Sequence, residues 1–236
     1  MDQNFYTGEV LLIDKPYTWS SFQAVNKIKH SLKNHPSLMV DGKKVKPKVG
    51  HAGTLDPLAT GLLIVCTGKK TKTINDLMGL EKEYTCTFFL GATTPCYDLE
   101  KPVDQTYPTD HITAEALEQA AKDFTGVQQQ VPPLFSAVMV NGKRAYELAR
   151  EGSDVELKSR EIEIKVFELS NINLPTVDFR IVCSKGTYIR SIARDFALAL
   201  NTGGHLTALR RTRIGDFNVS DAVSPVDFAA KMQALI

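Results

Sequence analysis

The stretch Gly50–Gly61, "GHAGTLDPLATG", holds three glycines, one proline, one histidine and a single acid, Asp56. The acid lies among apolar neighbours, although water solvates a carboxylate far better than leucine does. Pro57 directly after it is typical of a helix capped by Asp56, but Gly61 follows too soon for much helix to form. A proline and several glycines also fix a backbone, and a fixed backbone can aim a carboxylate for chemistry. The residues alone leave both interpretations open.

Strand and helix patterns are mixed on both sides of this stretch, without a regular βαβ rhythm. Apolar and alternating runs predict strands at 8–16, 62–68, 83–91, 160–169, 177–184 and 207–219. Helical periodicity predicts helices at 20–32, 112–126 and 185–204, and a short helix after the Asn141-Gly142 turn signal. This order predicts an α+β fold with a mixed, mainly antiparallel sheet flanked by helices.

The helix at 20–32 carries the clearest boundary signal. Ser20 and Gln23 have the spacing of a capping box, and a helical period then predicts a buried face. That face consists of Phe22, Val25, Ile28 and Leu32. The next segment, 33–48, is polar, rich in lysine and contains two prolines, so we expect a loop or insertion there. Further along, Thr113 is the predicted N-cap of the helix at 112–126.

The composition is that of an ordinary globular protein, with 43% hydrophobic and 23% charged residues among 236. We expect a single domain over residues 1–236. The polar start is unlike a signal peptide, and the apolar runs are too short to cross a bilayer, so we expect a cytoplasmic protein.

The net charge of +1 conceals a segregation of charge. Seven lysines lie between residues 27 and 48 against one acid, Asp41, while seven acids lie between 98 and 123 against two lysines. The seven lysines are Lys27, Lys29, Lys33, Lys43, Lys44, Lys46 and Lys48. Near the C-terminus, Arg210, Arg211 and Arg213 add positive charge. A solvated surface is the simpler interpretation, and a basic face that binds a polyanion is the alternative.

Several kinds of site lack their sequence signals. The four cysteines form no C-x-x-C pair, which favours buried reduced thiols, and the five histidines form no metal-binding motif. The sequence also lacks a P-loop, a G-x-G-x-x-G motif and a G-x-S-x-G motif.

An ionised Asp56 in an apolar setting needs a cationic partner, because desolvation favours the neutral acid. Arg190, at the start of a predicted helix, is a candidate for that role. Tyr84 and Tyr188 are core tyrosines by default, unless a pocket must stack a planar base. His51 is a loop histidine by default, and Lys15 the end of a strand.

With these residues in view, the chain resembles the TruB family of tRNA pseudouridine synthases over nearly its whole length. The resemblance rests on "LLIDKP", "GHAGTLDPLATGLL", "KEYTCTFFLGATT", "QVPPLFSA", "NGKRAYELAREG", "CSKGTYIRSIARD" and "HLTALRRT", which occur in the family's order. Twelve ordered positions in the second of these motifs make a chance match negligible.

The resemblance implies a pseudouridine-synthase-like fold with the active-site cleft across the sheet. It implies that uridine becomes pseudouridine at position 55 in the T-loop of tRNA, without a cofactor or metal. It further implies that Asp56 is the catalytic aspartate, that Tyr84 stacks on the flipped base and that Arg190 pairs with Asp56. By the same comparison, His51 lies against the RNA, and Tyr188 and Leu209 occupy substrate-contact positions.

Some positions depart from the family pattern. Phe135 and Met139 stand where the family usually has Tyr and Lys, and "TTPCYD" retains only Asp98 of the two usual aspartates. The basic insertion at 34–48 is longer than in many members, and we predict that it contacts tRNA. The chain ends soon after "SDAVSPVDF", so we expect a catalytic domain without the family's C-terminal PUA domain.

A stand-alone enzyme has two alternatives. A non-catalytic tRNA-binding protein or folding chaperone would need no buried acid, so Asp56, Tyr84 and Arg190 favour the enzyme. Relatives that depend on a guide RNA usually rely on a PUA domain and protein partners. We therefore expect a monomer that binds the T-arm of tRNA without a guide RNA and without a membrane.

Overall fold

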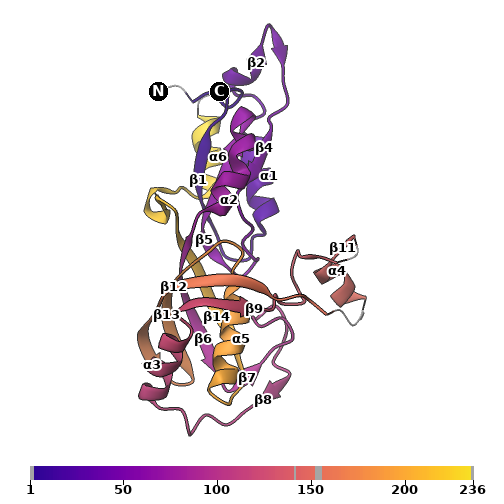
Figure 1. Ribbon diagram of the computed structural model, residues 1–236. Helices are drawn as coiled ribbons and strands as arrows, with labels where there is room; N and C mark the ends of the chain where they lie inside the picture. The colour runs from indigo at the N-terminus through magenta and orange to yellow at the C-terminus, as the bar shows by residue number, and fades with distance from the viewer. Residues whose placement is uncertain (1–2, 141, 152–155, 235–236) are drawn as a thin grey trace. The chain divides into compact units, whose positions relative to one another are not determined.

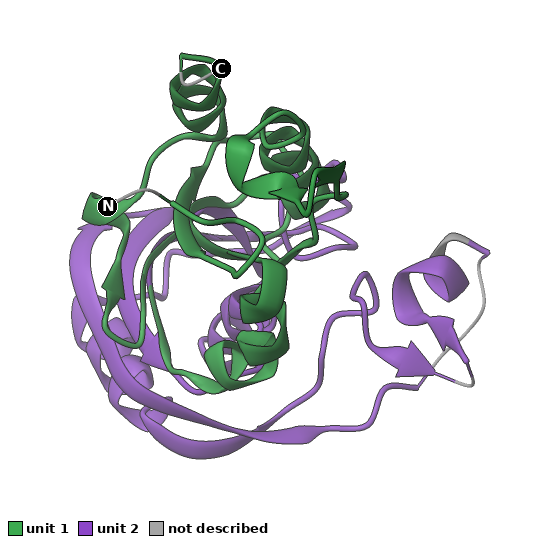
Figure 2. Cartoon of the chain, turned by 90° about the horizontal axis from the view of Figure 1, so that it is seen from above, with its two compact units in different colours: residues 1–83, 210–236 green, residues 84–209 purple. Residues whose placement is uncertain are grey.

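The two ends of the chain fold together. The computed structural model describes residues 3–140, 142–151 and 156–234. Unit 1 consists of Met1–Glu83 and Arg210–Ile236, and unit 2 of Tyr84–Leu209 (Figure 2). Two strands, β6 (Lys82–Leu90) and β14 (Gly204–Ile214), run from one unit into the other.

Strand β5 (Thr60–Thr67) is the centre of unit 1 (Figure 1). It pairs antiparallel with β1 (Val10–Lys15) along its length and with β4 (Val49–His51) near its end. The start of β5 pairs in parallel with β14, which then pairs antiparallel with β15 (Phe217–Asn218). In unit 1 the parallel pairing of β5 with β14, among antiparallel pairs, agrees with the predicted mixed, mainly antiparallel sheet.

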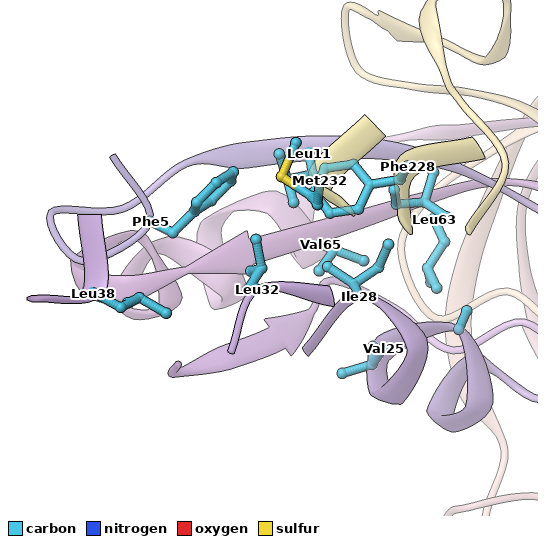
Figure 3. Close-up of a cluster of buried hydrophobic side chains, with 12 residues drawn as sticks. Phe5, Leu11, Val25, Ile28, Leu32, Leu38, Leu63, Val65, Phe228 and Met232 are labelled. Carbon is cyan, nitrogen blue, oxygen red and sulfur yellow. The ribbon is translucent and has the colours of Figure 1, made fainter. Parts of the chain in front are cut away.

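The apolar run in β5 is buried on both faces of the sheet. Because strand side chains alternate, Leu63 and Val65 point to one face, and Leu62 and Ile64 to the other. The first face packs against α1 (Ser21–Ser31) and α6 (Pro225–Gln233) in the cluster drawn in Figure 3. Other members of that cluster are Phe5, Leu11, Ile13, Val25, Ile28, Leu32, Leu38, Phe228 and Met232. The second face packs against α2 (Ile74–Gly79).

Helix α1 begins as its sequence predicts, but one residue of its predicted buried face is wrong. Ser20 and Gln23 form the capping box, and Val25 and Ile28 are buried. Phe22, however, is 70% exposed. Each residue advances a helix by about 100°, so Phe22 lies about 120° around the helix from Ile28 and falls outside the buried stripe.

The segment 33–48 has more structure than the loop we expected. It contains a 3₁₀ turn, Pro36–Leu38, and a hairpin of β2 (Met39–Val40) and β3 (Lys43–Lys44). The hairpin turn has positive φ at Asp41 (49°) and Gly42 (72°), as a two-residue turn of type I′ requires. The sequence "VDGK" is a signal for this turn, and the expectation of a loop overlooked it.

The C-terminal helix α6 is a second element that sequence patterns did not predict. Ser224 caps it by accepting a hydrogen bond from the Asp227 backbone, and Pro225 occupies the first turn. Two 3₁₀ segments, Gly68–Thr73 and Val219–Asp221, complete unit 1.

Unit 2 is a sheet in the order β6, β13 (Thr176–Cys183), β12 (Arg160–Asn173) and β9 (Gly126–Gln130). Helices α3 (Ala114–Asp123) and α5 (Ile189–Ala199) share its core. Aromatic rings 4.7 to 6.3 Å apart fill that core, and they belong to Phe88, Phe124, Phe167, Phe179 and Phe196. Short pairs also form between β7 (Ala92–Thr93) and β8 (Gln105–Thr106), and between β10 (Met139–Val140) and β11 (Lys143–Arg144), which precedes α4 (Ala145–Arg150).

Several further sequence predictions are confirmed. Strand β6 buries alternate side chains, Thr113 caps α3, and the cysteines of the chain are buried free thiols. Asn141 of the predicted turn lies outside the described residues, and Gly142 beside it has a φ of 84°. In the described ranges, no helix has the length and apolar character that crossing a membrane demands.

Candidate active site

Asp56 lies in the connection between β4 and β5 of unit 1. The Ala59 backbone N–H donates to the carbonyl of Asp56 at 3.1 Å, which closes a turn at Pro57 and Leu58. No helix starts here, so the helix-cap interpretation of Asp56 is wrong. Proline at the first central position is favoured in such turns. The side chain of Asp56 is half-buried, which leaves it accessible to a substrate.

Ser21, at the start of α1, fixes the residue before Asp56. Its hydroxyl donates to the Leu55 carbonyl at 2.9 Å and accepts from the Leu55 N–H at 2.8 Å. Both groups are buried, so a single side chain satisfies the two polar groups of one peptide residue. The start of α1 is therefore attached to the Asp56 loop.

Replacing Ser21 by Ala is expected to lower the free energy of unfolding by about 2 kcal/mol, because two buried backbone groups lose their partner. Urea denaturation measures the loss, with the exposed Ser220→Ala as a matched control. Equal stability of the two variants would show that the Ser21 hydrogen bonds do not anchor the loop.

Lys15 at the end of β1 is fully buried. Its ammonium donates to the carbonyls of Trp19 at 2.5 Å, Pro16 at 3.1 Å and Pro57 at 3.3 Å. Burial lowers the pKa of Lys15 from 10.5 to about 8; the charge of Asp56 opposes this shift and that of Arg211 adds to it. Lys15 is thus a strand end, as predicted, but it also ties the strand to the turn after Asp56.

Arg211 is the second buried cation at this loop, with 2% of its surface exposed. Its Nε donates to the Leu62 carbonyl at 2.8 Å, and its Nη2 to the Gly53 carbonyl at 3.1 Å. Gly61 has a φ of +101°, and any Cβ there would collide with the Arg211 backbone. Glycine therefore allows β14 to approach β5 closely enough for Arg211 to reach the loop.

These contacts hold the loop at Gly53, Leu55 and Pro57, on both sides of Asp56. All of these contacts are made to backbone atoms. They therefore fix the backbone from which the Asp56 side chain extends, and the carboxylate takes no part in them. A carboxylate held in this way can act as a nucleophile or as a general base. In the residues that the structure covers, no three His, Cys, Asp or Glu side chains gather as a metal site would require.

His51 ends β4, opposite Val65 of β5. Its Nδ1 is buried and has no hydrogen-bond partner among the described residues. Burial lowers the pKa of His51, the nearby Gly53 backbone opposes this shift, and the charge of Arg211 adds to it. The ring is therefore mainly neutral at neutral pH.

Tyr188 and Arg190 lie together at the start of α5 in unit 2. The Tyr188 backbone is held by Gln130, which accepts from its N–H at 2.8 Å and donates to its carbonyl at 3.1 Å. The guanidinium of Arg160 lies 4.5 Å from the centre of the Tyr188 ring. One face of that ring is thus occupied by a cation.

Arg190 is buried and bonded to unit 2 at several points. Its Nη1 donates to the Cys96 carbonyl at 3.0 Å and its Nη2 to the Phe135 carbonyl at 2.9 Å. Its Nε lies 3.6 Å from Oδ2 of the buried Asp98. Sequence reasoning did not place Asp98 in the site, although its retention in "TTPCYD" was an available signal.

The remaining predicted residues lie on the strands that the units share. Tyr84 is 8% exposed on β6, and Leu209 is half-buried on β14. Met139, which departs from the family pattern, is exposed on β10, and Phe135 contributes its carbonyl to Arg190. Asp56 and His51 belong to unit 1 and the other predicted residues to unit 2. The pairing of Arg190 with Asp56 therefore stays a prediction.

Two family models match the sequence in succession. Residues 41–189 match the N-terminal domain of the TruB family pseudouridylate synthases, and residues 190–235 match the tRNA pseudouridylate synthase B C-terminal domain. A protein of Flavobacterium johnsoniae named tRNA pseudouridine synthase B is 54% identical over 98% of this chain and 99% of its own length. A protein of the same name from Phocaeicola vulgatus is 55% identical over 95% of this chain and 93% of its own.

Solved structures agree with the fold. The chain is similar to one in a crystal structure of a Cbf5-Nop10-Gar1 complex, with a TM-score of 0.66, 29% identity and 91% of this chain covered. A structure of an H/ACA RNP bound to a substrate RNA containing 2'-deoxyuridine gives a TM-score of 0.67 at 26% identity over 96% of this chain. The chain spans about half of those longer chains, 51% and 54%. The fold, the Asp56 loop and these similarities lead to one conclusion: the chain belongs to the TruB family of pseudouridylate synthases.

Proposed function

We propose that this protein converts uridine to pseudouridine at position 55 in the T-loop of tRNA, with Asp56 as the catalytic residue. The main support is the loop that presents Asp56, which is fastened by Ser21, Lys15 and Arg211 to three different strands or helices. A catalytic side chain must be held in its productive geometry, and hydrogen bonds from the residues around it provide that support. Relatives named tRNA pseudouridine synthase B support the choice of tRNA.

The reaction is an isomerisation in which atoms and electrons balance within the nucleotide. The bond between C1′ and N1 breaks, the uracil turns in place, and a bond between C1′ and C5 forms. The hydrogen on C5 leaves as a proton, and N1 regains one. Asp56 attacks the sugar, attacks the base or takes a proton from the ribose. The three routes share the need for an ionised carboxylate beside the glycosidic bond.

The target base must leave its stack before a carboxylate can reach the glycosidic bond. In this proposal Tyr84 stacks on the flipped base, which offsets about 1–3 kcal/mol of the lost stacking. Arg190, oriented by Asp98, supplies the positive charge that keeps Asp56 ionised. His51, Tyr188 and Leu209 contact the surrounding RNA.

In this proposal the protein acts in the cytoplasm as a monomer, and it binds the T-arm of tRNA without a guide RNA. Release of tritium tests the reaction, because the hydrogen on C5 must leave when C5 bonds to C1′. The protein is incubated with tRNA transcribed from uridine labelled at C5, and the product is mapped by chemical labelling of pseudouridine. We expect tritium release and one modified T-loop uridine. Pseudouridine at another position would refute the assignment to position 55, and none at all would refute the activity.

A further inference from the structure

Lysines gather at one end of unit 1. Hairpin β2–β3 and the segment after it carry Lys43, Lys44, Lys46 and Lys48. Lys33 lies two residues after the end of α1. The 3₁₀ segment after β5 carries Lys69, Lys70 and Lys72. All eight side chains are exposed. We call these eight residues the lysine-rich end, and Figure 1 draws β2 at its tip.

Hydrogen bonds hold the three parts of the lysine-rich end together. The Gly68 N–H donates to the Lys48 carbonyl at 2.9 Å, which joins the 3₁₀ segment to the strand after the hairpin. The N-terminal segment bridges the same parts: the Phe5 N–H donates to the Ser37 hydroxyl at 3.1 Å, and the Lys69 N–H to the Thr7 carbonyl at 3.2 Å. The segments that carry the lysines are therefore neighbours in unit 1.

Little negative charge offsets these lysines. Across the described ranges, none of the eight forms an ion pair with a carboxylate. The acids in the neighbouring segments are Asp41 at the hairpin turn, Asp76 in the first turn of α2, and Glu9, which accepts a hydrogen bond from the Asn4 backbone. By contrast, Arg210 in the same unit is paired with both oxygens of Asp14, at 2.8 and 3.0 Å. The lysine-rich end thus has the uncompensated charge of a polyanion-binding surface.

Helix α1 connects the lysine-rich end to the Asp56 loop. The helix starts at Ser21, which bonds to Leu55, and contains no acid. Phe22, Asn26 and Lys29 follow each other at spacings of four and three residues, so they form one stripe along the helix, and Lys33 follows just after the end of the helix. Phe22, Lys29 and Lys33 are exposed. The stripe begins with an aromatic ring beside the loop and ends with a lysine.

The lysine-rich end is too far from Asp56 to touch the reacting nucleotide. Strand β5 begins just after the Asp56 loop and ends at Thr67, where the lysine-rich end starts. Its eight residues span about 23 Å at about 3.3 Å per step. Even in B-form DNA one strand carries a phosphate about every 3.4 Å of helix axis, so this distance spans several nucleotide steps.

We propose that the lysine-rich end binds the phosphate backbone of tRNA outside the T-loop, and so supplies affinity to a site whose chemistry lies at Asp56. This inference rests on the proposed function, because it takes tRNA as the substrate. Compact ammonium groups on flexible stems contact phosphates without reading sequence. The surface therefore contributes to KM and to salt dependence, and leaves kcat unchanged.

The test compares K43Q/K44Q/K46Q with a matched control, K101Q/K122Q/K231Q, in which three other exposed lysines are replaced. Pseudouridine formation is measured on full-length tRNA and on a stem-loop that carries only the T-loop and its closing base pairs. Each lost phosphate contact should lower the slope of log affinity against log salt by about 0.7–0.9. We expect a KM for tRNA about tenfold or more higher in the hairpin variant, an unchanged kcat and a salt slope lower by about two.

We expect the stem-loop KM to be the same for all three proteins, and K43R/K44R/K46R to behave as wild type on tRNA. A wild-type KM and salt slope in the hairpin variant would overturn the inference, and so would an equal loss on tRNA and stem-loop. Failure of the proposed function looks different: wild-type protein would then form no pseudouridine on either RNA. The salt slope of tRNA binding, measured by gel shift, would still test the surface in that case.

Discussion

Asp56→Asn is expected to abolish pseudouridine formation, with a fall in kcat of at least about 10³-fold, equal to about 4 kcal/mol of lost transition-state stabilisation. Asparagine has nearly the same shape but no charge, so it can neither attack the sugar or base nor accept a proton. Single-turnover kinetics with C5-labelled tRNA measure the loss.

The variant should fold and bind RNA as wild type does. The anchors of the loop run through backbone atoms of Gly53, Leu55 and Pro57, which the substitution leaves in place. Asp76→Asn, at an exposed acid in the first turn of α2, is the matched control. If Asp56→Asn retains product formation within tenfold of the control, Asp56 is not the catalytic group. If it retains a cellular effect on tRNA without product, the chaperone alternative gains support.

Lys15→Met is expected to lower the free energy of unfolding by about 2–4 kcal/mol, because carbonyl groups at the Asp56 loop lose their hydrogen-bond donor. Three carbonyls, of Pro16, Trp19 and Pro57, lose the ammonium to which they bond. Methionine fills similar volume, so lost hydrogen bonds rather than a cavity account for the change. Urea denaturation measures it, with the exposed Lys27→Met as control. A loss below about 1 kcal/mol, within the range of an ordinary surface change, would contradict this role.

The pH dependence of stability provides a second measurement on the same side chain. Because burial lowers the pKa of Lys15 from 10.5 to about 8, the unfolded chain retains a proton between those values that the folded chain has released. Stability then rises with pH in this window, by at most about 1.4 kcal/mol per pH unit. The difference in unfolding free energy between wild type and Lys15→Met should therefore grow from pH 7.5 to 9.5. A constant difference would show that Lys15 does not titrate there.

Local signals predicted the elements that depend only on local geometry. The capping box of Ser20 and Gln23, the Thr113 cap and the alternation in β6 hold in the structure because neighbouring residues alone produce them. The prediction that Phe22 is buried was wrong. The helical period fits almost as well when it is shifted by one residue, and such a shift rotates a side chain by about 100° around the helix. Asp56 itself came from the family motif, since local signals also allowed a cap.

By itself, therefore, the sequence determined the mixed α+β elements, the family and the aspartate on which the proposed chemistry depends. Only the tertiary structure decided what holds that aspartate in place. Lys15 reaches the Pro57 carbonyl across 42 positions, and Arg211 reaches Gly53 across 158. Which buried carbonyl receives which cation depends on strands that meet only after folding. No periodicity or motif within one segment predicts these contacts. Buried polar groups need a protein partner only after distant segments have packed together and excluded water.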